Sequence, residues 1–169
     1  DFAYFYETLG KWIKPKDINN FIDIESLEEK DELFDIEDIK IEGVDIPQAL
    51  NRMAGDKELL LNQLKRFIKS QENFSKNVLE FLKNNDLEST IREVHTLKGL
   101  CGNIGANKLS YKTKTLETYL KENGLNNQYF DLFESLKVDL DLLTKEIEKK
   151  LHLLQKTISK DINKEVDNN

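Results

Sequence analysis

Two histidines are the residues of this chain best suited to chemistry near neutral pH, because imidazole is the one side chain whose unperturbed pKa lies there. His152 stands among lysines and leucines, and we expect it to be an ordinary surface residue. His95 stands in a segment where Val94, Leu97 and Cys101 recur at helical spacing. It falls mostly outside that apolar stripe, so the spacing predicts that His95 faces water.

The residues after His95 would leave its ring open and place a cation beside it. In a helix, a side chain is covered by the residues three and four positions later, here Lys98 and Gly99. Glycine inside a helix costs about 1 kcal/mol relative to alanine, and at Gly99 it removes the side chain that would lie over the imidazole. An open imidazole beside an ammonium is suited to attack on a phosphoryl group. The alternative is an exposed histidine followed by glycine by chance.

From residue 45 onward, apolar residues recur every three or four positions, which is typical of amphipathic helices. Asp45, Asp56 and Asp86 stand where N-caps are expected. The expected helices cover 46–53, 57–83, 87–104, 108–122 and 129–154. The inward stripe of the second comprises Leu60, Leu64, Phe67, Phe74, Val78 and Phe81. Short loops make neighbouring helices antiparallel, so the sequence predicts an all-α fold, an antiparallel up-down four-helix bundle over 45–155 with a short helix across one end.

Three further segments surround this bundle. Residues 1–14 carry aromatic residues at helical spacing and predict a short extra N-terminal amphipathic helix, which Pro15 ends. Residues 15–44 alternate acids with isoleucines without a sustained period, and we interpret them as an acidic linker. Residues 156–169 form a polar C-terminal tail that we expect to fray. The chain begins at Asp1 without a methionine, which suggests a piece of a longer protein.

Composition excludes several classes of function. The net charge is −7, from 32 acids and 25 bases without a basic block, so we expect no nucleic-acid partner. No apolar run approaches the roughly 18 residues that would span a bilayer, so we expect no membrane contact by this chain. One cysteine allows no internal disulfide, which favours a cytoplasmic location. There is no glycine-rich phosphate loop or cluster of metal ligands, so we expect no kinase active site and no cofactor.

The segment 95–106, HTLKGLCGNIGA, resembles the signature of histidine phosphotransfer (HPt) domains, which is H-x-L-K-G followed by I-G-A. The resemblance covers roughly residues 43–145. It implies a four-helix bundle whose exposed histidine accepts a phosphoryl group from a receiver-domain aspartate and passes it on. Residue by residue, His95 matches the phosphoacceptor, Lys98 the phosphate-facing lysine and Gly99 the residue that gives access. Gly102 departs from the pattern and makes this helix unusually rich in glycine.

The resemblance also implies partners. They would be the receiver domains of a hybrid sensor kinase and of a response regulator in a two-component phosphorelay, with Mg²⁺ in the receiver. Residues 9–15, LGKWIKP, are similar to the last helix of a receiver domain, as expected for a fragment of a hybrid sensor kinase. We expect a monomer, because four helices close the core without a second chain.

A receiver would need a docking surface around His95. On the same helix we expect it to include Ile91, Arg92 and Gly102. On the preceding antiparallel helix the candidates are Gln71, Phe74 and Ser75. For Ile91 the alternative is that it helps to bury the edge of the bundle.

Three other classes of protein share part of this pattern. A chemotaxis-kinase phosphotransfer domain shares the bundle and the H-T-L-K-G core but takes its phosphoryl group from ATP through a kinase domain. A histidine-kinase dimerisation helix is disfavoured, because it typically has an acid directly after the histidine, where this chain has Thr96. A non-catalytic helical interaction module would use the leucine-rich stripe at 129–154 as an interface, although such stripes are more often core.

Overall fold

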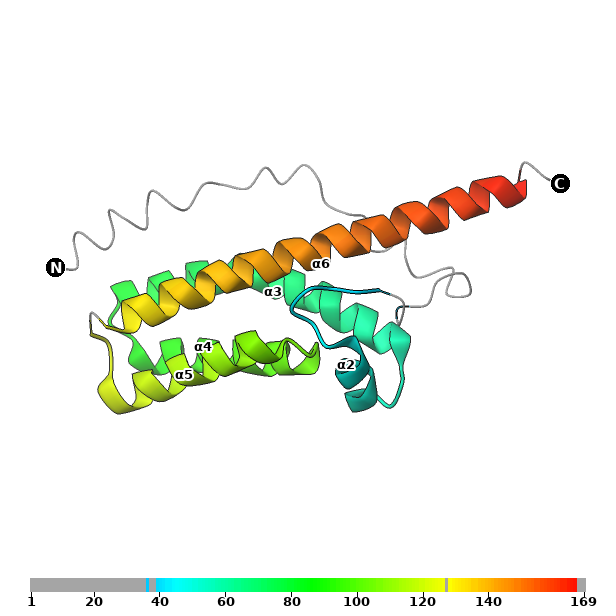
Figure 1. Cartoon of the computed structure of the whole chain (residues 1–169). Coiled ribbons are helices and arrows are strands. Elements are labelled where there is room, and N and C mark those ends of the chain that lie inside the picture. Colours follow the sequence, from blue (N-terminus) through cyan, green and yellow to red (C-terminus); the bar gives the residue numbers. More distant parts are fainter. Residues whose placement is uncertain (1–35, 37–38, 127, 167–169) are drawn as a thin grey trace. The chain divides into compact units, whose positions relative to one another are not determined.

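The computed structural model describes residues 36, 39–126 and 128–166. In these ranges the regular elements are the helices α2 (Ile46–Arg52), α3 (Lys57–Lys83), α4 (Leu87–Asn103), α5 (Asn107–Asn123) and α6 (Tyr129–Val166) (Figure 1). The predicted all-α fold is therefore confirmed. The expected helix over 1–14 lies outside the described residues, as does most of the expected linker.

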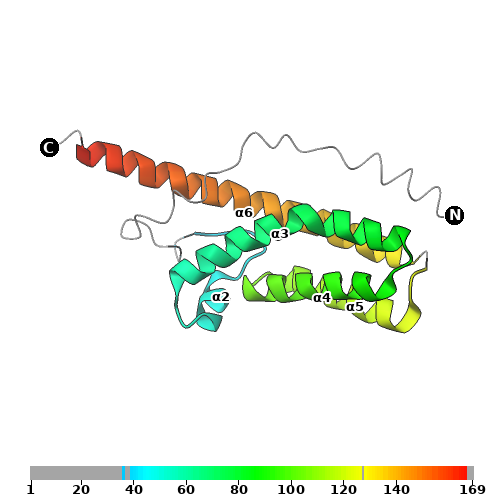
Figure 2. The ribbon, with the colours of Figure 1, turned by 180° about the vertical axis from the view of Figure 1, so that it is seen from behind.

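Helices α3 to α6 form the four-helix bundle. Helix α4 packs against both α3 and α5, and α6 also packs against both α3 and α5, while α2 contacts α3 (Figures 1 and 2). Each helix contributes fully buried apolar side chains to one shared core, including Leu64, Phe67, Val94, Leu97, Leu116 and Leu136. Removing these side chains from water is the main force that holds the helices together.

The helix boundaries follow local capping chemistry. The carboxylates of Asp45, Asp56 and Asp86 accept hydrogen bonds from the backbone N–H groups of Gln48, Leu59 and Ser89 at 3.0, 2.8 and 2.9 Å. An aspartate N-cap contributes about 1 kcal/mol by satisfying an amide that the helix leaves without a partner. All three caps confirm the positions predicted for the starts of α2, α3 and α4.

The stripe predicted for α3 changes face near its C-terminal end. Phe81 is only half-buried, whereas Leu79 and Leu82 are buried. Leu82 is four residues after Val78 and stays on the inward face. Phe81 is three residues after Val78 and therefore lies toward the edge of that face.

Two predicted boundaries differ from the structure. Ile36, Ile39 and Ile41 are buried, so the packed part of the chain includes residues that we had assigned to the 15–44 linker. Their burial requires no helical period, since an irregular segment can still place isolated apolar side chains against a core. At the other end, α6 is helical to Val166 instead of fraying after 155, and it continues past the N-terminal end of α3 (Figure 1). No proline or glycine interrupts residues 156–166.

The turn between α4 and α5 lies directly against the residue that caps α2. The backbone N–H of Asp45 donates to the carbonyl of Gly105 at 3.0 Å. Gly105 has φ +76°, and a Cβ added there would lie 2.5 Å from the carbonyl oxygen of Asp45. This contact ties the start of α2 to the end of the histidine-bearing helix, and only glycine allows so close an approach.

Candidate functional site

His95 lies on the outer face of α4 with its imidazole open to solvent. Its neighbours Val94 and Leu97 are buried in the bundle, as is Cys101 one turn further along. The His95 side chain is 63% exposed, which confirms the orientation that the spacing predicted. His152 is also exposed, on α6.

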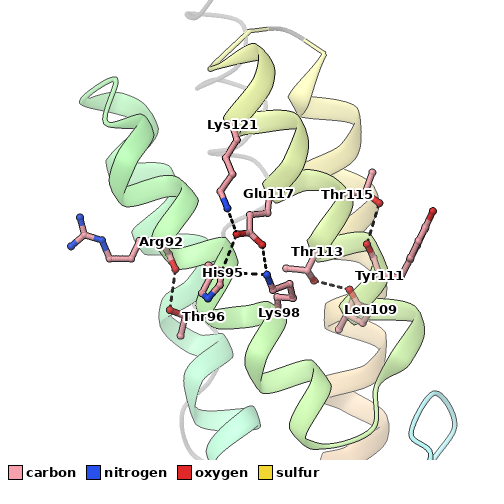
Figure 3. A network of polar contacts seen from close by, with 10 residues as sticks. All are labelled: Arg92, His95, Thr96, Lys98, Leu109, Tyr111, Thr113, Thr115, Glu117 and Lys121. Carbon is pink, nitrogen blue, oxygen red and sulfur yellow. Dashed lines mark hydrogen bonds and ion pairs between the residues drawn. The ribbon is translucent and has the colours of Figure 1, made fainter.

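A buried carboxylate on the neighbouring helix α5 holds the ring of His95 (Figure 3). Oε1 of Glu117 lies 2.9 Å from Nδ1 of His95 and 2.6 Å from Nζ of Lys121. Oε2 of Glu117 accepts a hydrogen bond from Nζ of Lys98 at 2.5 Å. The same Nζ lies 3.3 Å from Nδ1 of His95. One carboxylate therefore connects the histidine to two lysines, one from each helix.

The burial of Glu117 opposes the ionisation of its carboxyl group, so the charge on this group depends on its hydrogen-bond partners. Its side chain is only 5% exposed, and burial by itself would raise the pKa of a carboxyl group. Hydrogen bonds from Lys121, Lys98 and His95 outweigh that effect and lower the pKa of Glu117 from 4.5 to about 2. Glu117 is therefore ionised at neutral pH and can only accept hydrogen bonds.

The ionised carboxylate decides which nitrogen of His95 carries the proton. A 2.9 Å contact between Nδ1 and a carboxylate oxygen is a hydrogen bond only if Nδ1 is protonated. In the neutral ring, Nε2 then keeps its lone pair. Among the described residues, both polar contacts of the ring are made at Nδ1, and with Nδ1 protonated only the contact with Glu117 is a hydrogen bond, so Nε2 is the nitrogen available to an incoming group.

The structure places Lys98 beside the imidazole, as the sequence predicted, whereas a Cβ at Gly99 would not come within 4 Å of the imidazole. Lys98 Nζ lies beside the imidazole, although in this state it is bound to Glu117. Gly99 is exposed, and a Cβ added there would meet nothing within 4 Å. The fold thus leaves the space at Gly99 open and does not itself require a glycine there.

Sequence reasoning missed Glu117 and Lys121 as site residues. A signal was present, because Glu117 interrupts the apolar face of α5 between Leu116 and Leu120, both of which are buried. An acid on an inward stripe needs buried partners. Those partners lie on another helix, and sequence periodicity does not show which residues of two helices face each other.

The candidate docking residues have different surroundings. Phe74 was predicted to lie on the docking surface, and this is wrong, because it is 3% exposed and packs against Phe133 with ring centroids 6.2 Å apart. Phe74 belongs to the α3 stripe that faces the core. Gly102 is half-buried, and its carbonyl accepts a hydrogen bond from the guanidinium of Arg52, so the fold already uses this group.

The other docking candidates lie at the surface or partly so. Arg92 is exposed and pairs with Glu88 at 3.1 Å. Ile91, Gln71 and Ser75 are half-buried. Asn77 on α3 donates a hydrogen bond to Glu93 on α4 at 3.1 Å, and in this antiparallel register Ser75 lies near the level of His95.

The described residues offer neither a metal site nor a membrane-spanning helix. In residues 36, 39–126 and 128–166 no three His, Cys, Asp or Glu side chains come together to hold a metal ion. The same ranges contain no helix with the length and hydropathy needed to cross a membrane. Burial raises the pKa of the Cys101 thiol to about 12, so this cysteine is an inert core residue near neutral pH.

The lowered pKa of Glu117 makes a testable contribution to stability. Because its pKa is about 2 in the folded protein and 4.5 ordinarily, the stabilisation is complete above pH 4.5 and is lost as the pH falls toward 2. At neutral pH, we expect the free energy of unfolding of wild type to exceed that of Glu117→Gln by up to about 3 kcal/mol. Urea melts at several pH values should show this difference shrinking on acidification.

A suitable control is Glu88→Gln, which removes an exposed carboxylate of the same charge that pairs with Arg92. We expect it to change the unfolding free energy by less than about 0.5 kcal/mol at any pH. A Glu117→Gln difference that stays constant down to the lowest pH would contradict the ionic role of Glu117.

The fold and the site define a class of protein: an antiparallel four-helix bundle that presents one exposed histidine bound to a buried carboxylate and flanked by lysines. A sequence model of the Hpt domain family matches residues 58–157. The chain belongs to this family, as the resemblance of residues 95–106 predicted. Hpt domains are phosphotransfer modules of phosphorelays that interact with receiver domains and have no kinase site of their own. The chain matches none of the curated proteins and none of the solved structures with which it was compared.

Proposed function

We propose that His95 is the phosphoacceptor, and that its Nε2 accepts a phosphoryl group from a receiver-domain aspartate and passes it to the receiver of a response regulator. The observation that carries this proposal is the 2.9 Å contact of Nδ1 with the buried carboxylate of Glu117. That contact favours the tautomer with the proton on Nδ1, orients the ring and leaves the Nε2 lone pair facing solvent, as a nucleophile requires.

The transfer step balances without a further reactant. The Nε2 lone pair forms a bond to phosphorus while the bond between phosphorus and the aspartyl oxygen breaks, and the aspartate leaves with that electron pair. The ring gains positive charge and keeps its proton on Nδ1. The carboxylate of Glu117 stabilises this charge through the hydrogen bond already in place. The reverse sequence returns the phosphoryl group to a second aspartate.

Lys98 is proposed to neutralise the transferred phosphoryl group. Its Nζ lies 3.3 Å from Nδ1 of His95, and its side chain is 30% exposed, so the ammonium can turn from Glu117 to an anion on Nε2. Gly99 leaves the neighbouring surface open for the approach of the receiver.

We expect Lys98→Ala to transfer several-fold more slowly and to hold phosphohistidine for a shorter time, without unfolding. The reason is that one partly exposed, charge-assisted contact to the phosphoryl oxygens is lost, on the order of 1 kcal/mol. Single-turnover transfer from a labelled receiver at low salt measures the effect. Lys149→Ala, which removes an exposed lysine from α6, is the matched control. Equal rates for wild type and Lys98→Ala would count against any electrostatic role.

The phosphoryl donor is tested in two parallel labelling reactions. The full chain is incubated with a purified phosphorylated receiver, or with ATP and a chemotaxis-type kinase domain. We expect label on the chain only from the receiver, with Mg²⁺ required by the receiver's own acidic pocket. Label from the kinase alone would assign the chain to the chemotaxis type. The proposed parent is a hybrid sensor histidine kinase, which supplies the first receiver.

The receiver is proposed to dock over α3 and α4 around His95, with Ile91 supplying apolar contact one turn before the histidine. Ile91 is half-buried, so part of its side chain remains available to a partner. We expect Ile91→Asp to reduce receiver binding and transfer about tenfold while the thermal midpoint falls only slightly. A large fall in midpoint with normal transfer by the folded fraction would show that Ile91 serves the core instead.

A further inference from the structure

Lys121 is the second cation of the site, and the phosphotransfer signature does not include it. Its Nζ donates to Oε1 of Glu117 at 2.6 Å, the same oxygen that accepts from Nδ1 of His95 (Figure 3). Nζ of Lys98 instead donates to the other carboxylate oxygen, Oε2 of Glu117, at 2.5 Å. Each oxygen of the carboxylate therefore has its own lysine, and the two lysines come from different helices.

The two lysines differ in what they can do during transfer. Lys98 lies on α4, three residues after His95, and its Nζ is already 3.3 Å from the ring. If it turns to the phosphoryl group, Oε2 of Glu117 loses its partner. Lys121 lies on α5 one turn after Glu117, so its contact with Oε1 is local and survives that movement.

A carboxylate as buried as Glu117 cannot remain ionised and fixed without a cation, because desolvation of a bare charge costs several kcal/mol. Were both lysines to leave, the carboxylate would rotate toward water or take up a proton. Either change would weaken the Nδ1–H hydrogen bond that keeps Nε2 free.

On this basis, and resting on the proposed role of His95, we propose that Lys121 is a positioning residue that holds the Glu117 carboxylate on Nδ1 of His95 while Lys98 serves the phosphoryl group. Lys121 thus acts on the reaction through Glu117 and not by contact with phosphate. Its side chain is 54% exposed, so replacing it should not disturb the core.

The first test uses the unphosphorylated full chain. In ¹⁵N-histidine NMR spectra in mildly alkaline buffer, the wild-type His95 ring should be protonated on Nδ1. In Lys121→Met the Nε2-protonated form should rise measurably, and Lys121→Arg should restore the wild-type pattern. An unchanged tautomer in Lys121→Met would overturn the proposal, whether or not His95 is later shown to be phosphorylated.

The second test is a double-mutant cycle on the rate of transfer from a phosphorylated receiver. We expect Lys121→Met to slow transfer several-fold in the wild-type background and to have no further effect in the Glu117→Gln background. An equal loss in both backgrounds would overturn the proposal, because Lys121 would then act on the phosphoryl group directly. Lack of labelling of wild type would instead refute the function proposed for His95.

A matched control is available on α6. Glu146 and Lys150 form the same type of pair, with glutamate four residues before lysine and 3.8 Å between Oε1 and Nζ. Lys150→Met should leave both the His95 tautomer and the transfer rate unchanged. If Lys121→Met does not give a wild-type circular dichroism melt, Lys121→Gln replaces it in both tests.

Discussion

The His95→Gln variant is expected to lose all phosphorylation by a phosphorylated receiver. The amide of glutamine can still hydrogen-bond to Glu117 but has no lone pair that attacks phosphorus, so the loss should exceed a thousandfold and reach background. The His95 side chain is 63% exposed and outside the core, so the helical circular dichroism signal and the melting temperature should stay near wild type. The measurement is acid-labile, alkali-stable label on the full chain after incubation with the receiver.

His152→Gln provides the control, because it removes an exposed histidine from α6 without touching the site. It should be labelled at the wild-type rate. Retained acid-labile label in His95→Gln would refute the assignment of the phosphoacceptor, and loss of label in His152→Gln would move it to the other histidine.

Gly105→Ala is expected to destabilise the fold more than any surface substitution in this chain. The added Cβ would lie 2.5 Å from the backbone oxygen of Asp45, which is closer than real Cβ contacts occur, and the backbone of Gly105 has φ +76°. Positive φ costs a side-chain-bearing residue about 1–2 kcal/mol. The clash would also break the 3.0 Å hydrogen bond from Asp45 to Gly105, for a total on the order of 3 kcal/mol or more. Urea unfolding followed by circular dichroism measures it.

Gly55→Ala separates the clash from the backbone strain. Gly55 has nearly the same backbone conformation, φ +83°, but a Cβ there would meet nothing within 4 Å. We expect a loss of about 1 kcal/mol for Gly55→Ala, from the conformation alone. If the two alanine variants are equally stable, the close approach of Gly105 to Asp45 does not contribute to the fold.

The sequence alone determined the elements of this protein and the orientation of its histidine. Helix boundaries depend on capping residues and apolar spacing within a few positions, so Asp45, Asp56 and Asp86 predicted three helix starts correctly. The exposure of His95 follows from the same local geometry, since Val94 and Leu97 decide which face of α4 turns inward. The H-T-L-K-G signature then predicted the family, and the family match over 58–157 confirmed it.

Only the tertiary structure decided which groups from other helices meet His95. Glu117 is 22 residues away in the chain and reaches Nδ1 because α4 and α5 pack side by side, in a register that periodicity does not specify. The error at Phe74 has another origin, because Phe74 was assigned to the docking surface from its level along α3 alone, although its spacing already placed it on the inward stripe, where it packs against Phe133. The burial of Ile39 likewise required the fold, because an irregular segment has no period from which an inward face can be inferred. Spacing fixes what one helix presents, whereas a network across helices depends on their mutual rotation and register, which the packing of the whole core sets.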